Sequence, residues 1–230
     1  MVKITMDYTE WIPWYDDICN HFGYSQAEDY LSSLLLDRIA HKKASAVSFL
    51  NEFTGSNIQV VGNGPNLREI LEDAGPGIYF VADSALSSFF RILGPPDAIV
   101  TDLDGDPDLI MKCQDEGSRV VVHAHGDNQE KLGRIVPGLK EEILCTTQNV
   151  PFGKIYNFGG FTDGDRAAFL ADYLGAKSIT LLGFNFRLPT TKAGTDLAVK
   201  AEKLKFAERL LVYLASSRGK KFTAGNVIEI

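Results

Sequence analysis

The chain has 230 residues, of which 45% are hydrophobic and 23% charged, and its formal net charge is −7 at pH 7. This size and composition are typical of one ordinary domain, or of one domain with an appendage, and they argue against disorder. The negative charge argues against a basic groove for nucleic acid, although an acidic site loaded with metal can still bind phosphates. We therefore expect the partners to be small molecules.

Cysteine usage and the lack of long apolar runs bear on the compartment. The cysteines Cys19, Cys113 and Cys145 are widely spaced and form no C-x-x-C pair, which is typical of a reducing compartment and gives no zinc signature. The stretch MVKITMDYTEWIPWYDD is too acidic for a signal peptide, and no apolar run approaches the roughly 18 residues of a membrane span. We expect a cytoplasmic protein with no membrane partner.

The chain contains two consecutive segments with different hydrophobic patterns. Residues 1–54 have the apolar spacing of helices and are interpreted as a helical cap; the apolar positions include Leu31, Leu34, Leu35, Ile39, Val47 and Leu50. From residue 57, strand patterns alternate with helical ones, which indicates a parallel sheet. The expected strands are NIQVV, GIYFVA, DAIVT, RVVVH, EEILC and KSITLLGF. The prediction for residues 55–230 is an α/β fold, a Rossmann-like three-layer sandwich with a mostly parallel sheet.

The stretch VVGNGPNLRE at 60–69 combines a strand, a glycine turn and the start of a helix. Gly62 and Gly64 would let backbone N–H groups approach an anion, and the helix N-terminus would add partial positive charge. Gly62, Asn63 and Gly64 are therefore candidate nucleotide-phosphate contacts. Alternatively the glycines only turn the chain, because Leu67 stands where the third glycine of a G-x-G-x-x-G motif belongs.

Four aspartates follow the strand DAIVT, at positions 102, 104, 106 and 108. Asp106 is the expected N-cap of a helix, and Asp108 would favour its dipole. Asp102 and Asp104 have no such role; in an extended chain they project from one face at the carboxyl end of a strand, where open α/β sheets bind ligands. We predict that both bind a metal ion. A calcium loop is excluded, because proline and cysteine occupy the positions of its glycine and its last carboxylate.

Three further strand ends carry polar groups at the same edge. Asp83 follows IYFVA, the segment 123–128 follows RVVV, and the loop NFGGFTDGDRA spans residues 157–167. A cap is the structural alternative in each case: for Asp83 or Ser84, for Asp127 or Asn128, and for Asp163 or Asp165. Because Mg²⁺ prefers oxygen ligands, His125 is a candidate substrate or phosphate contact and His123 a structural residue. Arg166 is the favoured phosphate-binding cation.

The ordered blocks VGNGPNLRE, VADSAL, PDAIVTDLDGD, VVHAHGDN, NFGGFTDGDRA and LLGFNF resemble the archaeal-type 6-hydroxymethyl-7,8-dihydropterin pyrophosphokinases, which are relatives of the thiamin pyrophosphokinase catalytic domain. The resemblance covers about residues 1–190, since WIPWYDDICNHFGYS is similar to that family's helical start. It implies transfer of a diphosphate from ATP to the hydroxymethyl group of a reduced pterin, with Mg²⁺ and with release of AMP. Whether the product serves folate or methanopterin synthesis stays open.

The resemblance also implies residue roles. Asp102 and Asp104 match the paired aspartates of the related G-D-F-D-S metal motif, and these are the two residues expected to carry catalysis. Asp127 or Asn128 falls near a later T-D motif, which makes Asp127 a third candidate metal ligand.

The chain departs from the family pattern at two places. Asp163 matches the aspartate of a G-G-R-x-D stretch, but Phe161 replaces its arginine, which leaves open whether Arg166 supplies the missing guanidinium. Asn185 stands where the closer family has an aspartate.

For the pterin we expect a flat apolar slot with hydrogen-bonding groups. The candidate substrate contacts are His125, Asp127, Asn128, Thr147, Gln148, Asn157, Asp163 and Phe184.

Two other functions compete with this interpretation. AIVTDLDGD also matches the h-h-h-D-x-D-G motif of haloacid-dehalogenase-type phosphatases, in which Asp102 would be the nucleophile and Asp104 the general acid. Asp106 stands where that motif has Thr or Val, and two strands precede it. A non-catalytic nucleotide-binding module would use Gly62 and Asp83 but leave the acid cluster without a function.

The end of the chain predicts a long helix over 196–217 and then a final strand or hairpin, neither of which offers chemistry. The apolar face of the helix can pack on the sheet or on a second subunit. A homodimer is suggested only by the wider relatives.

Overall fold

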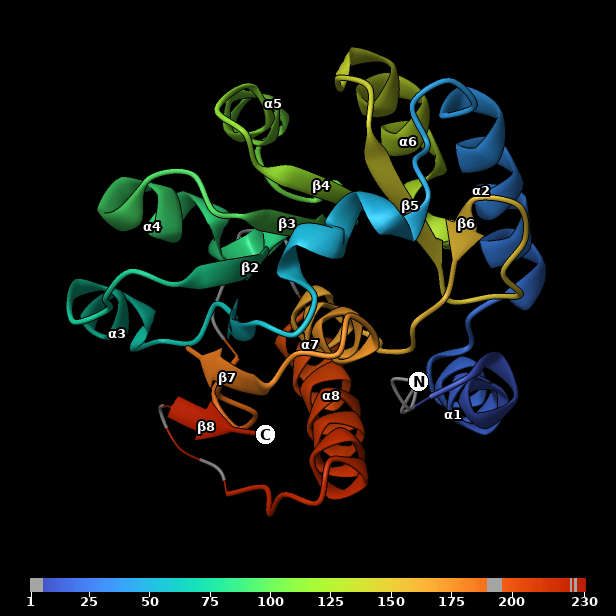
Figure 1. Ribbon diagram of the computed structural model, residues 1–230. Helices are drawn as coiled ribbons and strands as arrows, with labels where there is room; N and C mark the ends of the chain where they lie inside the picture. The colour runs from blue at the N-terminus through green and yellow to red at the C-terminus, as the bar shows by residue number, and fades with distance from the viewer. Residues whose placement is uncertain (1–5, 190–195, 224, 226) are drawn as a thin grey trace.

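The computed structural model describes residues 6–189, 196–223, 225 and 227–230, and its centre is an eight-stranded sheet in the order β6-β5-β4-β3-β2-β1-β7-β8 (Figure 1). All neighbouring strands pair in parallel except β8, which is antiparallel to β7. The strands are β1 Asn57–Val61, β2 Ile78–Ala82, β3 Ala98–Thr101, β4 Arg119–Ala124, β5 Ile143–Thr147, β6 Ile155–Tyr156, β7 Ser178–Leu182 and β8 Val227–Glu229. The predicted α/β class and mostly parallel sheet are confirmed.

The register of the strands decides what meets at the carboxyl edge of the sheet. Val61, the last residue of β1, lies level with Val81 in β2 and Leu182 in β7, while Thr101 at the end of β3 lies level with Val122 in β4. Because the strands are parallel, the polar residues that follow them emerge at the same edge. The strands themselves are largely buried on both faces, as β3 and β5 show throughout.

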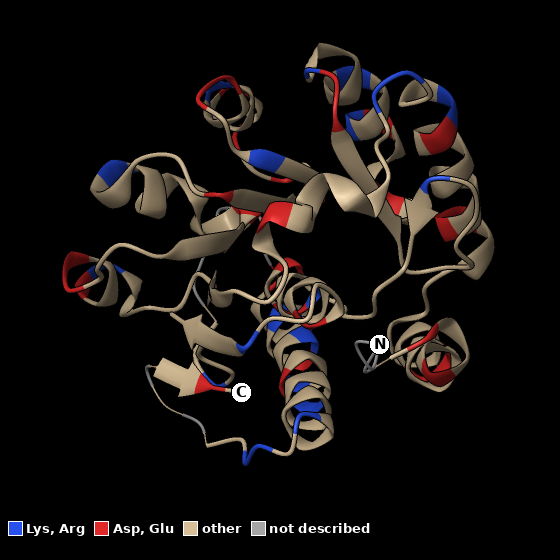
Figure 2. Cartoon of the chain, in the orientation of Figure 1, with Lys and Arg blue, Asp and Glu red and all other residues tan. Residues whose placement is uncertain are grey.

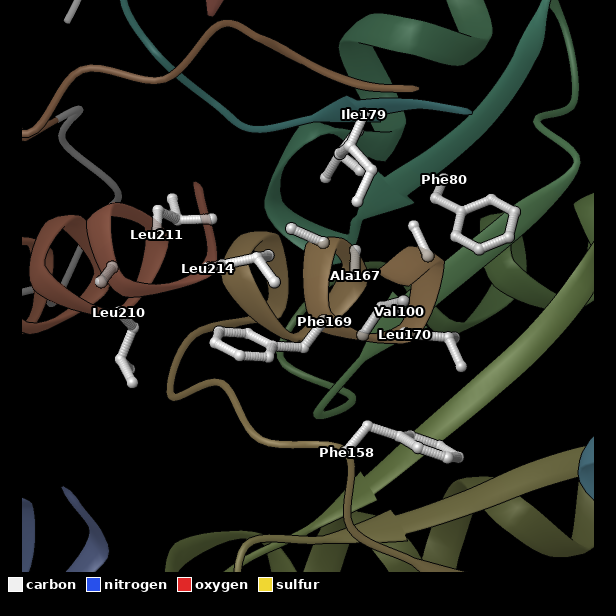
Figure 3. Close-up of a cluster of buried hydrophobic side chains, with 14 of the residues drawn as sticks. Phe80, Val100, Phe158, Ala167, Phe169, Leu170, Ile179, Leu210, Leu211 and Leu214 are labelled. Atoms are coloured by element: carbon white, nitrogen blue, oxygen red, sulfur yellow. The ribbon is translucent and has the colours of Figure 1, made fainter. Parts of the chain in front are cut away.

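Helices cover both faces of the sheet and complete the three layers (Figure 1). One face packs against α3 Leu67–Glu72, α4 Asp83–Leu93, α5 Pro107–Asp115, α6 Gln129–Ile135 and part of α2 Gln26–Ile39. The other packs against α7 Asp163–Tyr173, α8 Leu197–Ser217, α1 Tyr8–Phe22 and the 3₁₀ helix η1 Val47–Phe53. Figure 3 shows α7 between the strands and α8, with Phe80, Val100 and Ile179 on its strand side and Leu210, Leu211 and Leu214 on α8.

The N-terminal segment is helical, as predicted. Its apolar spacing, however, does not mark the buried face of α2, because Leu31 and Leu34 are 50% and 40% exposed. The residues that α2 buries are Asp29, Ser32, Ser33 and Leu36. Because α1 shares one hydrophobic core with the sheet, the segment packs directly on the α/β fold. The domain boundary at residue 54 stays a prediction, and residues 1–5 lie outside the described part of the chain.

The C-terminal segment forms the predicted helix, α8, and ends in β8. Two further 3₁₀ turns, η2 Gly126–Asn128 and η3 Val136–Gly138, flank α6. The three cysteines are free and buried. None of the helices in the described residues has the length and apolarity that crossing a membrane requires.

Candidate active site

A cavity of about 680 Å³ opens at the carboxyl edge of the sheet. Its wall is built from the residues that follow β1 to β5 and β7, the first turn of α7, the turn between α1 and α2, and one face of α8. This is the edge where open α/β sheets bind ligands, and the volume is in the range of small-molecule sites. Most of the predicted site residues meet here.

Asp83 is the first of three carboxylates at the floor of this cavity. It begins α4 directly after β2 and is 5% exposed. Its Oδ2 accepts hydrogen bonds from Thr101 Oγ1 at 2.6 Å and from the Gly105 N–H at 2.9 Å. A Cβ at residue 105 would lie 1.8 Å from Asp83 Oδ1, so only glycine permits this approach. The sequence predicted that Asp83 contacts a nucleotide phosphate. In the structure its carboxylate lies close to two other carboxylates, those of Asp102 and Asp163.

Asp102 follows β3 and is the second carboxylate. Its Oδ1 accepts the Asp104 N–H at 3.2 Å, and its Oδ2 lies 3.6 Å from His125 Nε2. The Asp127 N–H donates to His125 Nδ1 at 3.4 Å, so Nε2 carries the hydrogen that faces Asp102. Burial disfavours the charged form of Asp102, but His125, the Arg166 charge and the Asp104 N–H outweigh it and lower the pKa of Asp102 to about 2.

Asp163, at the start of α7, is the third carboxylate. It is not the helix cap, because Thr162 and Asp165 form the capping box. Arg166 Nη1 lies 3.3 Å from Asp163 Oδ1, and both side chains are about nine-tenths buried, at 9% and 12% exposure. Burial, and then the charge of Asp102, raise the pKa of Asp163 well above its ordinary value, while Arg166 opposes this.

These three carboxylates form a cluster whose ligand atoms all lie within 4.8 Å of one another. Two negative charges at that distance repel by roughly 3.5 kcal/mol at an effective dielectric of about 20. Hard divalent cations prefer carboxylate oxygens of this kind, so the cluster fits such an ion by the chemistry of its donors. We refer to Asp83, Asp102 and Asp163 as the carboxylate cluster.

The cluster differs from the predicted metal pair. The prediction placed Asp102 and Asp104 on one face of an extended chain, but Leu103 has φ 65°, so the backbone turns instead of extending. The Asp104 side chain is 55% exposed and forms an ion pair with Lys131 Nζ. Asp127 is also exposed and lies outside the cluster. The extended-chain geometry was therefore wrong, and of the three predicted ligands the cluster contains Asp102.

The glycine turn after β1 is also built differently from the predicted anion cradle. Gly62 N–H donates to Leu182 O at 2.9 Å and Gly64 N–H donates to Gly183 O at 2.6 Å, so these donors continue the pairing with β7. A Cβ at residue 64 would lie 2.5 Å from Gly183 O, which explains the glycine sterically. Gly62, Asn63 and Gly64 line the cavity, but the two glycine N–H groups are engaged.

Three predicted substrate contacts serve the structure instead of the cavity wall. Asn128 is 1% exposed and donates to Asp102 O and His123 O at 3.0 and 2.8 Å. Thr147 Oγ1 accepts the Asn149 N–H, and Asn157 Nδ2 donates to Asn149 O. None of these three lines the cavity in the described part of the chain. The prediction that His125, Asp127, Gln148, Asp163 and Phe184 lie at the site agrees with the cavity wall.

His123 has a structural position, as expected. It is 2% exposed, and its Nδ1 lies 3.0 Å from Thr146 Oγ1. The Thr146 hydroxyl donates to Val122 O at 3.2 Å, so it accepts from His123 Nδ1–H, which fixes the tautomer. Burial, and then the charges of Arg166 and His125, lower the pKa of His123 well below its ordinary value.

Phe161, which departs from the arginine of the related motif, lies in an aromatic group. Its ring centroid lies 5.4 Å from that of Phe22 and 6.5 Å from that of Tyr24. Lys203 Nζ lies 5.4 Å from the Tyr24 ring centroid and 5.7 Å from that of Phe161. A cation from α8 therefore stands beside the position where the related motif places one.

The sequence interpretation missed the residues that α1, α2 and α8 bring to the cavity. They are Tyr24, Ser25, Glu28, Asp29, Lys200, Lys203 and Leu204. The C-terminal helix was expected to offer no chemistry, but its Lys200 and Lys203 line the cavity. Figure 2 shows Lys and Arg side by side with acidic residues along α8. Lysines three residues apart were the available signal, but the sequence alone does not show which surface they face.

Charge is unevenly distributed over the cavity wall. The acidic residues of the wall are Glu28, Asp29, Asp83, Asp102, Asp104, Asp127, Asp163 and Asp196, and its Lys and Arg residues are Lys131, Arg166, Lys200 and Lys203. Among the described residues that line the cavity, Asp and Glu outnumber Lys and Arg two to one. A polyphosphate is therefore expected to enter this cavity together with cations.

Comparisons with known proteins identify the family of the chain. A family model described as "6-hydroxymethylpterin diphosphokinase MptE-like" matches residues 35–191. Three curated archaeal proteins named 6-hydroxymethyl-7,8-dihydropterin pyrophosphokinase are similar over almost the whole chain. The protein from Pyrococcus furiosus is 41% identical, with 92% of this chain and 96% of that protein covered. Those from Methanothermobacter thermautotrophicus and Methanocaldococcus jannaschii are 37% and 36% identical, over 91% of this chain and 95% and 96% of theirs.

Proposed function

The chain belongs to the MptE-like 6-hydroxymethylpterin diphosphokinase family, and from this premise we propose that it transfers a diphosphate from ATP to 6-hydroxymethyl-7,8-dihydropterin. The hydroxymethyl oxygen attacks the β-phosphorus of ATP, the bond from that phosphorus to the α,β-bridging oxygen breaks, and AMP leaves. The products are the pterin diphosphate, AMP and the proton of the hydroxyl group.

The observation that supports this proposal is the carboxylate cluster at the floor of a cavity of about 680 Å³. Asp83, Asp102 and Asp163 come from three different elements and would hold a divalent cation, for which Mg²⁺ is the proposed ion. A bound Mg²⁺ neutralises phosphate oxygens and favours in-line attack, which is the main chemical demand of phosphoryl transfer.

The remaining side chains orient the carboxylates and face the phosphates. His125 Nε2 faces Asp102, and Arg166 Nη1 faces Asp163, so each of these carboxylates is held from one side. Lys131, Lys200 and Lys203 line the same cavity and are the proposed phosphate contacts, with Arg166. Phe184, Phe186 and Tyr24 contribute ring surface for the flat pterin or adenine.

The geometry gives less support to a haloacid-dehalogenase-type phosphatase. In that mechanism Asp104 would be the proton donor beside the nucleophile Asp102. Asp104 is instead half exposed, pairs with Lys131 and lies outside the cluster. A cytoplasmic location and a homodimer stay predictions.

An assay of products tests the proposed activity. The protein is incubated with ATP, Mg²⁺ and 6-hydroxymethyl-7,8-dihydropterin, and the products are separated by chromatography. We expect AMP and the pterin diphosphate in equal amounts, and neither without the pterin. Inorganic phosphate as the product with no need for an acceptor would indicate a phosphatase instead, and AMP formed with thiamine but not with the pterin would change the acceptor.

Substitutions in the cluster test which carboxylates matter. Asp83→Asn, Asp102→Asn and Asp163→Asn should each lower kcat by roughly 10²–10³-fold, because each removes charge from the place where phosphate charge must be neutralised. In Asp163→Asn the thermal midpoint should not fall, since burial and the charge of Asp102 disfavour the charged form of Asp163 in the folded protein. Turnover and thermal unfolding are measured on the same preparations.

The aspartates outside the cluster are the matched controls. Asp108→Asn, on the exposed first turn of α5, should keep wild-type turnover. Asp104→Asn should lose less than about tenfold if the cluster is the metal site. A loss at Asp104 as large as that at Asp163 would restore the sequence-based metal pair and contradict the cluster.

A further inference from the structure

We propose that Asp29 of α2 is a positioning residue that holds Arg166 against the carboxylate cluster through Gln148, and the His125 loop through Gly126. This proposal rests on the proposed function, because it assigns the N-terminal helices a part in building that same site. No substrate contact is required of Asp29 itself.

Asp29 is a buried carboxylate with an unusual set of partners. It is 2% exposed and lies on the face of α2 that packs against η2, α6 and the carboxyl ends of β4 and β5. Its Oδ1 accepts the Gly126 N–H at 2.7 Å, and its Oδ2 accepts Tyr15 OH and Gln148 Nε2, each at 2.7 Å. Three short bonds from neutral donors compensate part of the cost of burying this carboxylate. An apolar residue would pack the helix at lower cost, so the polar group needs another explanation.

The first arm of the network runs through Gln148. Because the amide nitrogen of Gln148 donates to Asp29, its Oε1 is left to accept from Arg166 Nη2, at 3.2 Å. Trp11 Nε1 donates to Gln148 O at 2.7 Å and holds the backbone at the same place. With the opposite amide orientation, an NH₂ group would face the guanidinium, donor against donor. Asp29, which can only accept when ionised, therefore selects the orientation that binds Arg166.

The second arm runs through Gly126 and the η2 turn. A Cβ at residue 126 would lie 2.9 Å from Glu28 Cβ, so the start of α2 packs directly against this turn. His125 is the N-cap of η2, and its Nε2 faces Asp102 Oδ2 at 3.6 Å. Through its two oxygens Asp29 thus reaches the groups beside Asp102 and beside Asp163, two members of the cluster.

Asp29→Asn is the informative variant, because it keeps the shape and replaces one acceptor by a donor. The new amide must either face the Gly126 N–H or make Gln148 turn its NH₂ group toward Arg166. We expect kcat to fall by roughly 10–100-fold, the size expected when a reacting group is displaced by about 1 Å. Asp37→Asn, elsewhere on α2, is the matched control and should behave as wild type.

Two measurements separate positioning from general loss of structure. Mn²⁺ affinity of the protein without substrates, measured by electron paramagnetic resonance, should fall in Asp29→Asn but not in Asp37→Asn. In a double-mutant cycle with Gln148→Leu, the second substitution should add little to the first, because both break the same chain of bonds. Asp29→Asn combined with Gln148→Glu should recover part of kcat, because a carboxylate at position 148 can accept both from the amide introduced at position 29 and from Arg166.

Several outcomes would overturn the proposal. These are wild-type kcat and Mn²⁺ affinity in Asp29→Asn, activity that falls only with the folded fraction, or fully additive effects of the two substitutions. If Asp29→Asn does not fold, Gln148→Leu still tests the first arm, since it leaves the Tyr15 and Gly126 bonds to Asp29 in place. If the wild type makes no AMP with the pterin, the proposed function fails, while the Mn²⁺ measurement still reports on Asp29.

Discussion

Leu103 carries an uncommon backbone conformation at the centre of the site. Its φ of 65° lies in the left-handed region, which costs a bulky residue on the order of 1–3 kcal/mol and persists only where the surroundings hold it. The side chain is 2% exposed, and the Leu103 N–H donates to Thr101 Oγ1 at 2.8 Å. The turn keeps Asp102 at the cluster and brings the Gly105 N–H to Asp83.

The buried neutral His123 predicts a specific pH dependence of stability. Its pKa is lowered in the folded protein, while the unfolded chain takes up a proton near pH 6.5. The unfolded state therefore binds more protons below about pH 6.5, and the free energy of unfolding falls as the pH falls, by up to about 1.4 kcal/mol per pH unit from this residue. Above about pH 6.5 its contribution is constant. Urea unfolding between about pH 5 and pH 7.5 measures the slope.

The control for this prediction is a second histidine. His123→Gln should reduce the slope by about one proton, whereas His41→Gln, at an exposed position, should leave it unchanged. Equal slopes in wild type and His123→Gln would show that His123 does not contribute. The absolute stability of the variant is not part of the test.

For single residues, the sequence shows which side chains reach the carboxyl edge of the sheet but not which groups they pair with. Asp83, Asp102 and Asp163 each follow a strand or open a helix, so their convergence follows from parallel topology. That Asp104 turns toward Lys131 depends on one left-handed residue, and no pattern in LDGD indicates it. The amides of Gly62 and Gly64 are likewise taken by β7, a strand more than a hundred residues away in the chain.

Among the elements, α8 contributes one part of the cavity wall. Lys203 Nζ stands over the rings of Tyr24 and Phe161, on a wall where acidic groups outnumber basic ones. Lys203→Met keeps the length and loses the charge, so we expect KM for ATP to rise roughly fivefold to tenfold, which corresponds to about 1–1.4 kcal/mol. Steady-state kinetics at low and at moderate ionic strength measure the effect.

Lys205→Met supplies the comparison on the same helix. Lys205 is 62% exposed and pairs with Glu202, so its loss should leave KM unchanged. If Lys203→Met also leaves KM unchanged at both salt concentrations, α8 does not contribute a phosphate contact.

Helices α2 and α8 illustrate what periodicity can and cannot predict. Both α2 and α8 were predicted as helices from their apolar spacing. For α8 the buried face is the apolar one, but for α2 it is not, because Leu31 and Leu34 are exposed while Asp29 is buried. A polar residue can replace an apolar one on a buried face only when donors from distant segments meet it, and here they come from Tyr15, Gly126 and Gln148.

For the molecule as a whole, the alternation of strands and helices was sufficient to predict the sheet. Each predicted strand corresponds to an observed one, and the helical crossovers between successive strands favour parallel pairing. The strand that the sequence did not single out, β6, is two residues long and lies at one edge of the sheet, while β8 at the other edge corresponds to the predicted final strand. The closure of the cavity by α1, α2 and α8 depends on long-range contacts, such as Asp29 to Gln148 over 119 residues, which carry no local signal.

The charge of the cavity predicts that nucleotide binding depends on metal. Eight acidic and four Lys and Arg residues line the described wall, so ATP alone meets a net negative surface. In EDTA, ATP should therefore leave the thermal midpoint unchanged. With Mg²⁺ and ATP at about 100 times the Kd, stability should rise by about 2.7 kcal/mol, which for 230 residues is roughly 5–10 °C. Asp163→Asn should lose most of this shift and Asp108→Asn should keep it. An equal shift with ATP in EDTA would mean that fixed cations such as Arg166 bind the phosphates without a metal ion.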